Sequence, residues 1–428
     1  MTFSKEFSLV LGIDIGTSGV RAVLMNSDYE VIAQQSRIMT NFGSNHRDPV
    51  VWWETLESTL DLLREEAQGQ WDKVAGIAVD GTSGTLLALN NKFEPIGDAM
   101  MYNDPVADAD ALEIIHLKAP RESAAHGATS GLAKLIVLQK ITGCHRVLHQ
   151  ADWVMGKFLG EYLWSDENNS LKTGYDPIER EWPDWISHTT ARSELLPNVK
   201  EPGQIVGEIH PEIAKCFGLS MDVKIISGTT DGCAAFLATG ATEIGDGVTS
   251  LGSTLVVKIL SEKPLFSPEY GVYSHRFGDT WLPGGASNTG GNVLAHFFSN
   301  EELLSLSRKV DPDEPINLEY YPLVKPGERF PINDPAYPPQ LSPRPEDDAT
   351  FLHGLLFGMS AVESLAYDRL EELGAPALKS LRTVGAGSHN SAWTDLRQRQ
   401  LSVPMCDVAS DQAAAGAARL ALKGLVNF

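Results

Sequence analysis

Apolar residues along the first 90 positions gather in short runs that mostly fit strands. Residues 8–25 predict two strands joined by a tight turn, because Val, Ile and Leu dominate both arms and "GTSG" supplies turn residues between them. Alternation over residues 30–39 predicts a third strand, whereas residues 50–67 carry apolar side chains at helical spacing. Strands follow at 74–80 and 85–90. The predicted order is three meandering strands, a helix and further strands.

The second half of the chain repeats this order. Residues 246–260 again predict strand, Gly/Ser turn and strand, and further strands are expected at 270–277, 280–285 and 381–387. Helical spacing predicts four helices, at about 291–299, 350–371, 391–401 and 411–425. A repeated arrangement of this kind predicts an α/β protein with two similar domains facing each other. The cleft between two such domains is the natural place for a ligand.

Composition narrows the class of protein. The chain has 428 residues, 43% of them hydrophobic and 21% charged, which is typical of a soluble globular protein of two domains. No apolar run approaches the roughly 20 residues that span a bilayer, and the N-terminus does not resemble a signal peptide. We therefore expect a cytoplasmic protein without a membrane partner, as a monomer or homodimer.

Cysteine usage and charge exclude two further classes. The four cysteines (Cys144, Cys216, Cys233 and Cys406) are scattered without a CxxC pair, which argues against a disulfide framework or a zinc site. The net charge of -22 argues against nucleic acid, whose phosphates are bound by Lys and Arg. The net charge does not exclude small anionic ligands, because a local group of backbone N–H donors can hold a phosphate on an acidic protein.

The turn in "GIDIGTSGVRAV" is the first candidate for chemistry. Its small residues let the backbone approach an anion, and the hydroxyls of Thr17 and Ser18 can donate to phosphate oxygens. Asp14 ends the preceding strand and is placed to hold Mg²⁺, which prefers a few carboxylates together with phosphates. The alternative is an ordinary Gly-rich hairpin whose Asp and Thr satisfy their own turn.

A second acid occupies a comparable place in "SGTTDGCAAFLATGA". Asp231 follows a strand and precedes an apolar helix, so it is either a general base or an N-cap, the commonest use of Asp at that position. "SLGSTLVV" adds a phosphate-type turn at Gly252, Ser253 and Thr254, and "VGAGSHNSAW" places glycines between a strand and a helix. Each motif alone is weak, but their order along the chain is more specific.

These residues resemble the FGGY carbohydrate kinases over nearly the whole chain. The matching segments are "GIDIGTSGVRAV", "VDGTSGTLLAL", "SGLAKLIVLQK", "SGTTDGCAAFLATGA", "SLGSTLVV", "PGGASNTGGNVL", "FLHGLLFGMSAVE" and "VGAGSHNSAW". Within the family, "DGTSGT", "ADW", "ERFPI" and "PQLSPRPE" resemble the short xylulokinase-like members of cyanobacteria and plants, which phosphorylate D-ribulose.

The resemblance implies two ribonuclease-H-like (actin-like ATPase) domains with mixed sheets around an interdomain cleft. The implied N-terminal domain spans 1–238 and is completed by a C-terminal helix at 412–428, and the implied ATP-binding domain spans 239–411. The implied reaction is phosphorylation of a primary hydroxyl of a ketopentose by ATP with Mg²⁺. D-ribulose is the expected sugar and D-xylulose the alternative. A member of the actin-like class that binds ATP as a scaffold, without sugar turnover, is a further alternative.

Roles carry over residue by residue from the resemblance. Asp231 matches the catalytic base and, with Asp14, lies near the metal and the sugar. Ser83 matches a sugar contact, while Asp80 is expected only to support its turn. Asn103 and Asp104 are further candidates for the sugar, although this chain lacks the Arg found nearby in larger members. The residues matched to ATP binding are Thr17, Ser18, Gly252, Ser253, Thr254, Gly291, Gly387, Asn390 and Trp393.

Two other groups of residues have simpler interpretations. Trp52 and Trp53 could stack on a sugar, but such a pair more often anchors a helix to the core. Five histidines lack the spacing of metal ligands and are interpreted as surface or hydrogen-bonded core groups: His126, His145, His149, His210 and His353.

Overall fold

The computed structural model describes residues 9–426, which divide into two compact units. Unit 1 holds the described residues up to Ala238, the short piece His275–Gly278, and the chain from Gln412 onward. Unit 2 holds Thr239–Ser274 and Asp279–Asp411. Residue 8 of the first predicted strand, and the end of the predicted helix 412–428, lie outside the described residues.

Unit 1 is built on a mixed six-stranded sheet with the order β3-β2-β1-β4-β10-β9. The first three strands form an antiparallel meander, β4 and β10 run parallel to β1, and β9 is antiparallel to β10. The strands are β1 (Leu9–Ile15), β2 (Gly19–Met25), β3 (Val31–Ile38), β4 (Val74–Gly81), β9 (Ile205–Glu208) and β10 (Lys224–Thr230). The carboxyl ends of β1, β4 and β10 therefore meet at one edge of the sheet.

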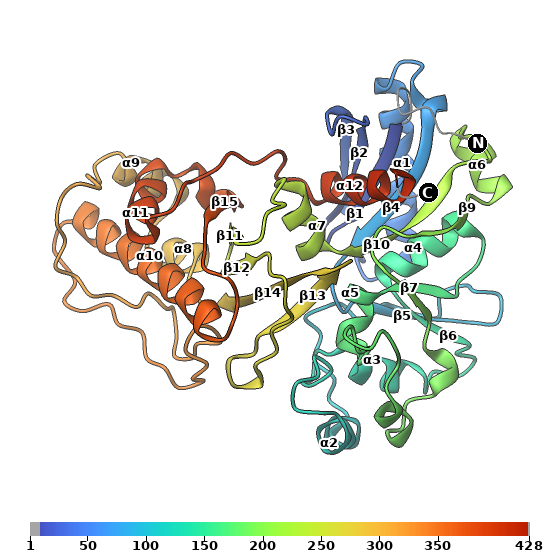
Figure 1. Cartoon of the computed structure of the whole chain (residues 1–428), viewed down its shortest axis with the longest axis horizontal. Helices are drawn as coiled ribbons and strands as arrows, with labels where there is room; N and C mark the ends of the chain where they lie inside the picture. Colours follow the sequence, from blue (N-terminus) through green and yellow to red (C-terminus); the bar gives the residue numbers. More distant parts are fainter. Residues whose placement is uncertain (1–8, 427–428) are drawn as a thin grey trace. The chain divides into compact units, whose positions relative to one another are not determined.

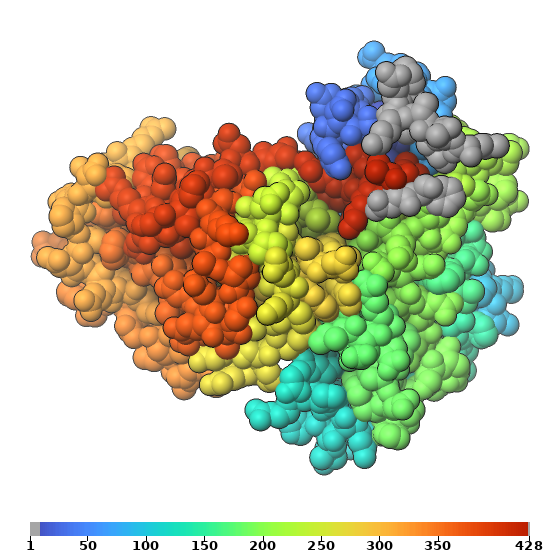
Figure 2. Space-filling view, in the orientation of Figure 1, coloured from blue at the N-terminus to red at the C-terminus, as the bar shows by residue number. Residues whose placement is uncertain are grey.

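Eight α-helices belong to the described part of unit 1. They are α1 (Pro49–Glu66), α2 (Ala109–Lys118), α3 (Gly131–Leu138), α4 (Gln150–Leu159), α5 (Glu167–Ser170), α6 (Pro211–Phe217), α7 (Asp231–Ala238) and α12 (Ala413–Val426). The helix α1 begins at Pro49 after the N-cap Asp48, whose side chain accepts a hydrogen bond from the Val50 amide. In the space-filling view of Figure 2, the blue-green segment that contains α2 lies on the surface.

The helix α12 completes the core of unit 1 from the far end of the chain (Figure 1). It packs between β1 and α7, and two glycines allow this close approach. A Cβ on Gly12 of β1 would collide with the α12 backbone at Ala414, and one on Gly416 of α12 would collide with the α7 backbone at Ala234. The absence of side chains at these two positions lets helix and sheet meet through their backbones.

Two small sheets extend unit 1 beyond its main sheet. β5 (Leu86–Leu89) pairs antiparallel with β6 (Arg146–His149), and β7 (Trp164–Asp166) pairs in parallel with β8 (Asn198–Lys200). The predicted strand at 85–90 therefore exists but does not join the sheet of its neighbours. Its partner lies about 60 residues away along the chain, a long-range pairing that local patterning does not encode.

Unit 2 repeats the core arrangement of unit 1. Its sheet has the order β13-β14-β12-β11-β15, and β11 pairs antiparallel with β12 and parallel with β15, as β1 does with β2 and β4. The strands of this sheet are β11 (Asp246–Leu251), β12 (Leu255–Ile259), β13 (Tyr273–Phe277), β14 (Thr280–Ser287) and β15 (Ser380–Val384), and the part of β13 from His275 onward is counted with unit 1. The α-helices are α8 (Gly291–Phe297), α9 (Asn300–Ser307), α10 (Asp348–Glu372) and α11 (Ser391–Leu401). The predicted α/β fold with two similar domains is confirmed.

The helix α10 is the core helix of unit 2. By length and composition it could cross a membrane, but 72% of its most apolar stretch is buried within the protein. Phe351, Leu355 and Met359 lie in the same hydrophobic cluster as Leu251 and Val257 of the sheet. Its apolar character therefore belongs to the core.

The tryptophan pair also belongs to a core, as predicted. Trp52 is fully buried and Trp53 is 9% exposed, and both contact the ring of Trp153 edge to face. Trp52 donates its indole N–H to the carbonyl of His46, which satisfies its polar end. Neither ring is presented to a ligand.

Candidate active site

Two aspartates stand side by side at the carboxyl edge of the unit 1 sheet. In the parallel ladder of β1 and β4, Asp14 is the register partner of Asp80, so both side chains point to the same face. Asp14 is 5% exposed and Asp80 is fully buried. The guanidinium of Arg21, on β2, donates to Asp14 Oδ2 at 2.9 Å.

Asp231 lies at the same edge, where β10 passes into α7. The two elements are continuous, since β10 ends at Thr230 and α7 begins at Asp231. Asp231 Oδ1 accepts a hydrogen bond from the neighbouring amide of Gly232 at 2.7 Å, and the side chain is only partly buried. Asp231 is thus the first residue of the helix rather than the residue before it, and a reactant can reach its carboxylate.

The three carboxyl groups influence one another. Burial raises the pKa of Asp14, the Arg21 guanidinium opposes that shift, and the charge of Asp231 adds to it. Burial raises the pKa of Asp80 well above its usual range, and the charges of Asp14 and Asp231 raise it further. The three carboxyl groups therefore share one electrostatic environment, in which Asp80 holds a proton more tightly than an isolated carboxyl group does.

Asp80 does not have the role expected from the sequence, which was to support its own turn. Neither of its carboxyl oxygens accepts a hydrogen bond from a donor group within residues 9–426. Asp14 is its register partner on the neighbouring strand, and the charge of Asp14 raises the pKa of Asp80. The partner of Asp80 is thus the acid on the adjacent strand.

The donor set at this edge fits a magnesium ion. Mg²⁺ takes oxygen ligands and commonly needs only one or two carboxylates, completed by phosphates and water. Asp14 and Asp231 carry such oxygens at this edge, and no donor group within residues 9–426 bonds to the carboxyl oxygens of Asp80. Within residues 9–426 no group of three or more acidic, His or Cys side chains forms a complete protein-only metal site.

The first predicted phosphate turn connects β1 to β2. The amide of Gly16 donates to the carbonyl of Gly19 at 3.0 Å, which closes the hairpin, and Thr17 and Ser18 are exposed at its tip. Their hydroxyls and amides are therefore accessible to an anion next to Asp14.

Ser83 lies in the loop that follows β4. Its neighbours Thr82, Gly84 and Thr85 are buried, whereas Ser83 is partly exposed. Gly84 has φ of +85°, a conformation that favours glycine, and it reverses the chain after Ser83. The loop thus presents one hydroxyl from an otherwise buried backbone.

Asn103 and Asp104 have different environments. Asn103 is exposed. Asp104 forms a bidentate ion pair with Arg47 and accepts the Met101 amide at 2.7 Å, and the hydrogen bond from Arg47 lowers its pKa. The carboxylate of Asp104 is engaged in holding its own turn.

The second predicted phosphate turn lies in unit 2, between β11 and β12. Gly252 donates to the Thr254 carbonyl at 3.2 Å, and the amide of Gly291, at the start of α8, donates to the Gly252 carbonyl at 2.9 Å. Ser253 is exposed at the tip. The turn corresponds in topology to residues 16–19 of unit 1, because β11 and β12 correspond to β1 and β2.

The late Gly-rich segment of unit 2 is held in place by several structural contacts. Asn390 caps α11 by accepting the Trp393 amide at 3.1 Å and donates to the Ser307 hydroxyl at 2.9 Å. Trp393 is 1% exposed, so its ring lies in the core, and a Cβ on Gly387 would lie 2.7 Å from it. The lack of a side chain at Gly387 lets the chain lie close to the Trp393 ring.

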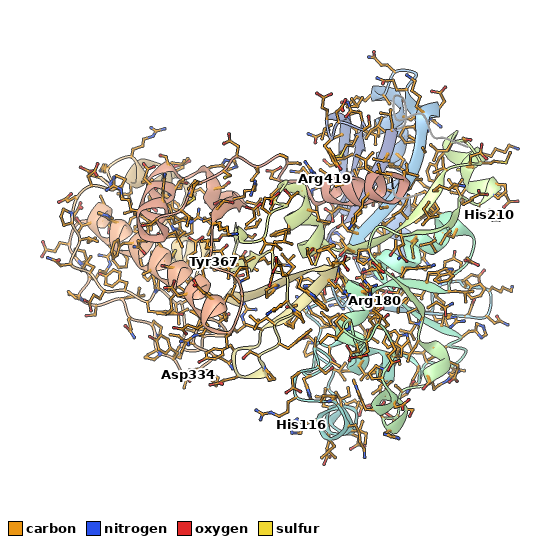
Figure 3. All side chains as sticks on the ribbon, viewed as in Figure 1. His116, Arg180, His210, Asp334, Tyr367 and Arg419 are labelled. Carbon is orange, nitrogen blue, oxygen red and sulfur yellow. The ribbon has the colours of Figure 1, made fainter. Side chains whose placement is uncertain are left out.

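A buried ion pair ties this segment to the sheet of unit 2. Arg397 of α11 donates from Nε and Nη2 to the Glu363 carboxylate of α10 at 2.5 and 2.7 Å, and both side chains are fully buried. Glu363 also accepts the Thr249 hydroxyl of β11, which contacts the hydroxyl of Tyr367, labelled in Figure 3. Because β11 leads into the turn at residues 252–254, this network fixes α11 relative to that turn.

Sequence reasoning missed several of these relations. It identified Asp14 and Asp80 separately but not their adjacency, which needs the parallel register of β1 and β4. The signal was present, since both acids end β-rich runs and parallel neighbours share an edge. The roles of Arg21 and of the Arg397–Glu363 pair depend on contacts between distant segments, and no local pattern marks them.

Comparison with known families agrees with this architecture. Residues 9–129 match the N-terminal domain and residues 247–425 the C-terminal domain of the FGGY family of carbohydrate kinases. The two matches together cover well over half of the chain. The chain belongs to the FGGY family of carbohydrate kinases.

Individual relatives are distant. The xylulose kinase of Escherichia coli (strain K12) is 27% identical over 290 residues, covering 64% of this chain and 59% of that enzyme, so the match spans less than two thirds of the relative's length.

Solved structures share the fold. A xyloylose kinase from Brucella ovis has a TM-score of 0.84 at 22% identity, covering 98% of this chain and 91% of that one. The glycerol kinase of Plasmodium falciparum, solved with ADP, has a TM-score of 0.80 at 13% identity, covering 99% and 90%.

Proposed function

We propose that the protein transfers the γ-phosphoryl group of ATP to a primary hydroxyl of a ketopentose, with D-ribulose as the preferred acceptor. The observation that carries the proposal is the position of Asp231. Its partly exposed carboxylate lies at the start of α7, beside the buried pair Asp14 and Asp80. A base at this position suits phosphoryl transfer to a hydroxyl, whereas a scaffold that only binds nucleotide needs no base.

Asp231 acts as the general base. Its carboxylate accepts the proton of the sugar hydroxyl while that oxygen forms a bond to the γ-phosphorus, and the bond from phosphorus to the β-phosphate oxygen breaks to release ADP. Ser83 donates its hydroxyl to the sugar, and Asn103 and Asp104 line the same side. The chain's contribution is mainly alignment of the hydroxyl with the phosphorus.

The remaining residues hold the phosphates. The exposed Thr17 and Ser18 serve one turn, and Gly252, Ser253 and Thr254 serve the other, with Gly291 behind it. Gly387, Asn390 and Trp393 shape the segment that borders adenosine. Asp14 and Asp231 would hold Mg²⁺, which neutralises charge on the phosphates when it is bound.

Two sugars are candidates. The segments "DGTSGT", "ADW", "ERFPI" and "PQLSPRPE" favour D-ribulose, whereas the E. coli relative is named for xylulose and favours D-xylulose. Since these sugars differ at one hydroxyl, only a direct comparison separates them. The four cysteines are all free, which favours a reducing, cytoplasmic setting.

The test is ADP release with ATP, Mg²⁺ and a panel of D-ribulose, D-xylulose, L-ribulose, ribitol and glycerol, with the phosphorylated product identified by mass spectrometry. We expect the highest kcat/KM for D-ribulose. A folded protein that binds ADP but phosphorylates none of the panel would contradict the proposal and favour an ATP-binding scaffold. A higher kcat/KM for D-xylulose would reassign the sugar alone.

The Asp231→Asn variant tests the base. It keeps the shape of the side chain, and kcat is expected to fall by about 10² to 10⁴, the usual contribution of a general base. ADP affinity, measured by calorimetry, should stay unchanged. Asp222→Asn, an exposed acid outside the site, is the matched control. Full turnover by Asp231→Asn would remove the proposed base.

A further inference from the structure

The loop that carries Ser83 is held from one side by Gln150, the first residue of α4. Gln150 is fully buried, and its Oε1 accepts both the backbone amide of Thr82 at 3.0 Å and the Thr82 hydroxyl at 2.8 Å. The backbone N–H of Gln150 donates to the Thr85 carbonyl at 3.0 Å. One residue therefore bonds to both ends of the loop.

The orientation of the Gln150 side-chain amide follows from its hydrogen-bond partners. A backbone N–H can only donate, so the atom that faces Thr82 is the oxygen and not the nitrogen. Nε2 then points elsewhere, is buried, and has no hydrogen-bond partner within residues 9–426. An unpartnered buried donor destabilises the folded state. The position therefore bears a stability cost that an apolar side chain would avoid.

Lys134 of α3 holds the loop from another side. Its Nζ donates to the carbonyl of Gly84 and to the carbonyl of Met101, each at 2.6 Å, and the side chain is fully buried. Met101 precedes the turn that contains Asn103, and the amide of Met101 is held by Asp104. One buried cation thus ties the Ser83 loop to the Asn103–Asp104 turn.

Hydroxyl contacts close the arrangement. The hydroxyls of Thr82 and Thr85 lie 2.6 Å apart, and the Thr85 hydroxyl accepts the Tyr102 amide at 2.9 Å. Among the contacts within residues 9–426, Thr82, Gly84 and Thr85 are each fixed by a buried partner, whereas Ser83 is not and is partly exposed. Together these side-chain contacts fix the position of the Ser83 hydroxyl.

We propose that Gln150 and Lys134 are positioning residues for the sugar: they fix the Ser83 hydroxyl, and its spacing from the Asn103–Asp104 turn, and so set which ketopentose is accepted. This inference rests on the proposed function. Neither residue touches the sugar, because both are buried. Their effect passes through the loop backbone, where a small displacement of a contact is sufficient to weaken alignment.

The test uses Gln150→Met and Lys134→Met, which keep an unbranched side chain of similar length (one atom shorter than Lys) and remove its hydrogen bonds. The sugar KM is expected to rise about tenfold for each variant, while the KM for ATP stays within about twofold. The ratio of kcat/KM for D-ribulose over D-xylulose should fall. Gln150→Glu keeps an acceptor oxygen for Thr82 and should recover most of the sugar affinity.

A double variant and a matched control separate positioning from stability. Because both residues act on one loop, Gln150→Met with Lys134→Met should raise the sugar KM by much less than the product of the single effects. Thr59→Val removes a buried, hydrogen-bonded hydroxyl from α1 and should lower Tm without moving the sugar KM. Hydrogen exchange at the amides of Thr82 and Thr85 should be faster in both Met variants and unchanged in Thr59→Val.

The outcomes are distinct. If wild-type protein phosphorylates a sugar but the Met variants keep the wild-type sugar KM, the positioning role is overturned and the proposed function stands. Equal changes in both KM values, together with a lower Tm, would reduce the two residues to a structural role. If wild-type protein accepts no sugar, both proposals fail. Should Lys134→Met not fold, the two Gln150 variants decide the matter alone.

Discussion

At the scale of single residues, Lys134 is unusual because it is a fully buried cation that donates to two neutral carbonyls. Burial lowers its pKa to about 8, a shift that the charge of Asp104 opposes and that of Lys172 reinforces. Ammonium groups prefer water, so below that pKa the folded state bears the whole cost of burying the charge.

This shift predicts a pH dependence of stability. Between pH 8 and the ordinary Lys pKa of about 10.5, the unfolded chain binds more protons at this site than the folded chain, so stability rises with pH. Wild-type protein should therefore gain free energy of unfolding relative to Lys134→Met as pH rises from 8 to 10.5, and the difference should stay flat from pH 6 to 7.5. Urea unfolding of both proteins across this range provides the measurement. A flat difference over the whole range would contradict the lowered pKa.

The same scale shows what the sequence could predict of the site. Asp14, Thr17 and Asp231 were recognisable as candidates because each stands where an apolar run meets a turn or a helix, which is a local signal. Two contacts join segments about 70 residues apart: the register pairing of Asp14 with Asp80 and the hydrogen bond from Thr82 to Gln150. Such contacts follow from register and packing, and no single stretch of sequence contains them.

At the scale of elements, the strands and helices that were predicted have a periodicity that is complete within one segment, whereas α2 to α6, α9 and β6 to β9 were not predicted. Residues 391–401 form α11, and the predicted helix at 350–371 is α10 with short extensions at both ends. β5 shows where this kind of prediction ends. Its residues were predicted to form a strand, but its pairing with β6 in a separate sheet was not predicted. The partner of a strand is chosen by tertiary packing rather than by its own pattern.

The packing of α12 gives a prediction at this scale. Alanine is a better helix former than glycine, yet Gly416→Ala should destabilise the protein by about 1–3 kcal/mol, because the added Cβ meets the α7 backbone at Ala234. α7 begins with Asp231, so kcat should fall as well. Thermal unfolding and steady-state kinetics measure both effects. Lys423→Ala, an exposed change in the same helix, should leave stability within about 0.5 kcal/mol, and a Gly416→Ala protein as stable as wild type would show that α12 can move away freely.

At the scale of the whole molecule, the chain uses one arrangement twice. In each unit an antiparallel pair encloses a small-residue turn, and a parallel strand flanks the pair. The two copies have diverged in chemistry. Unit 1 places acids at its strand ends, whereas unit 2 surrounds its turn with amides and hydroxyls and keeps the charged Arg397–Glu363 pair in its core. We propose that unit 1 carries the sugar chemistry and one phosphate turn, and that unit 2 binds the rest of the nucleotide.

Gly291 tests that division, because it is where α8 supports the unit 2 turn. A Cβ at this position would lie 2.7 Å from the Gly252 carbonyl oxygen, which the Gly291 amide now contacts, so Gly291→Ala must displace the turn. The KM for ATP should rise about tenfold and ADP binding should weaken in calorimetry, while the KM for sugar changes little. Ala295→Ser, an exposed change in the same helix, is the control. If Gly291→Ala instead raised the sugar KM and spared ATP, the assignment of the nucleotide to unit 2 would be wrong, since the altered backbone belongs wholly to that unit.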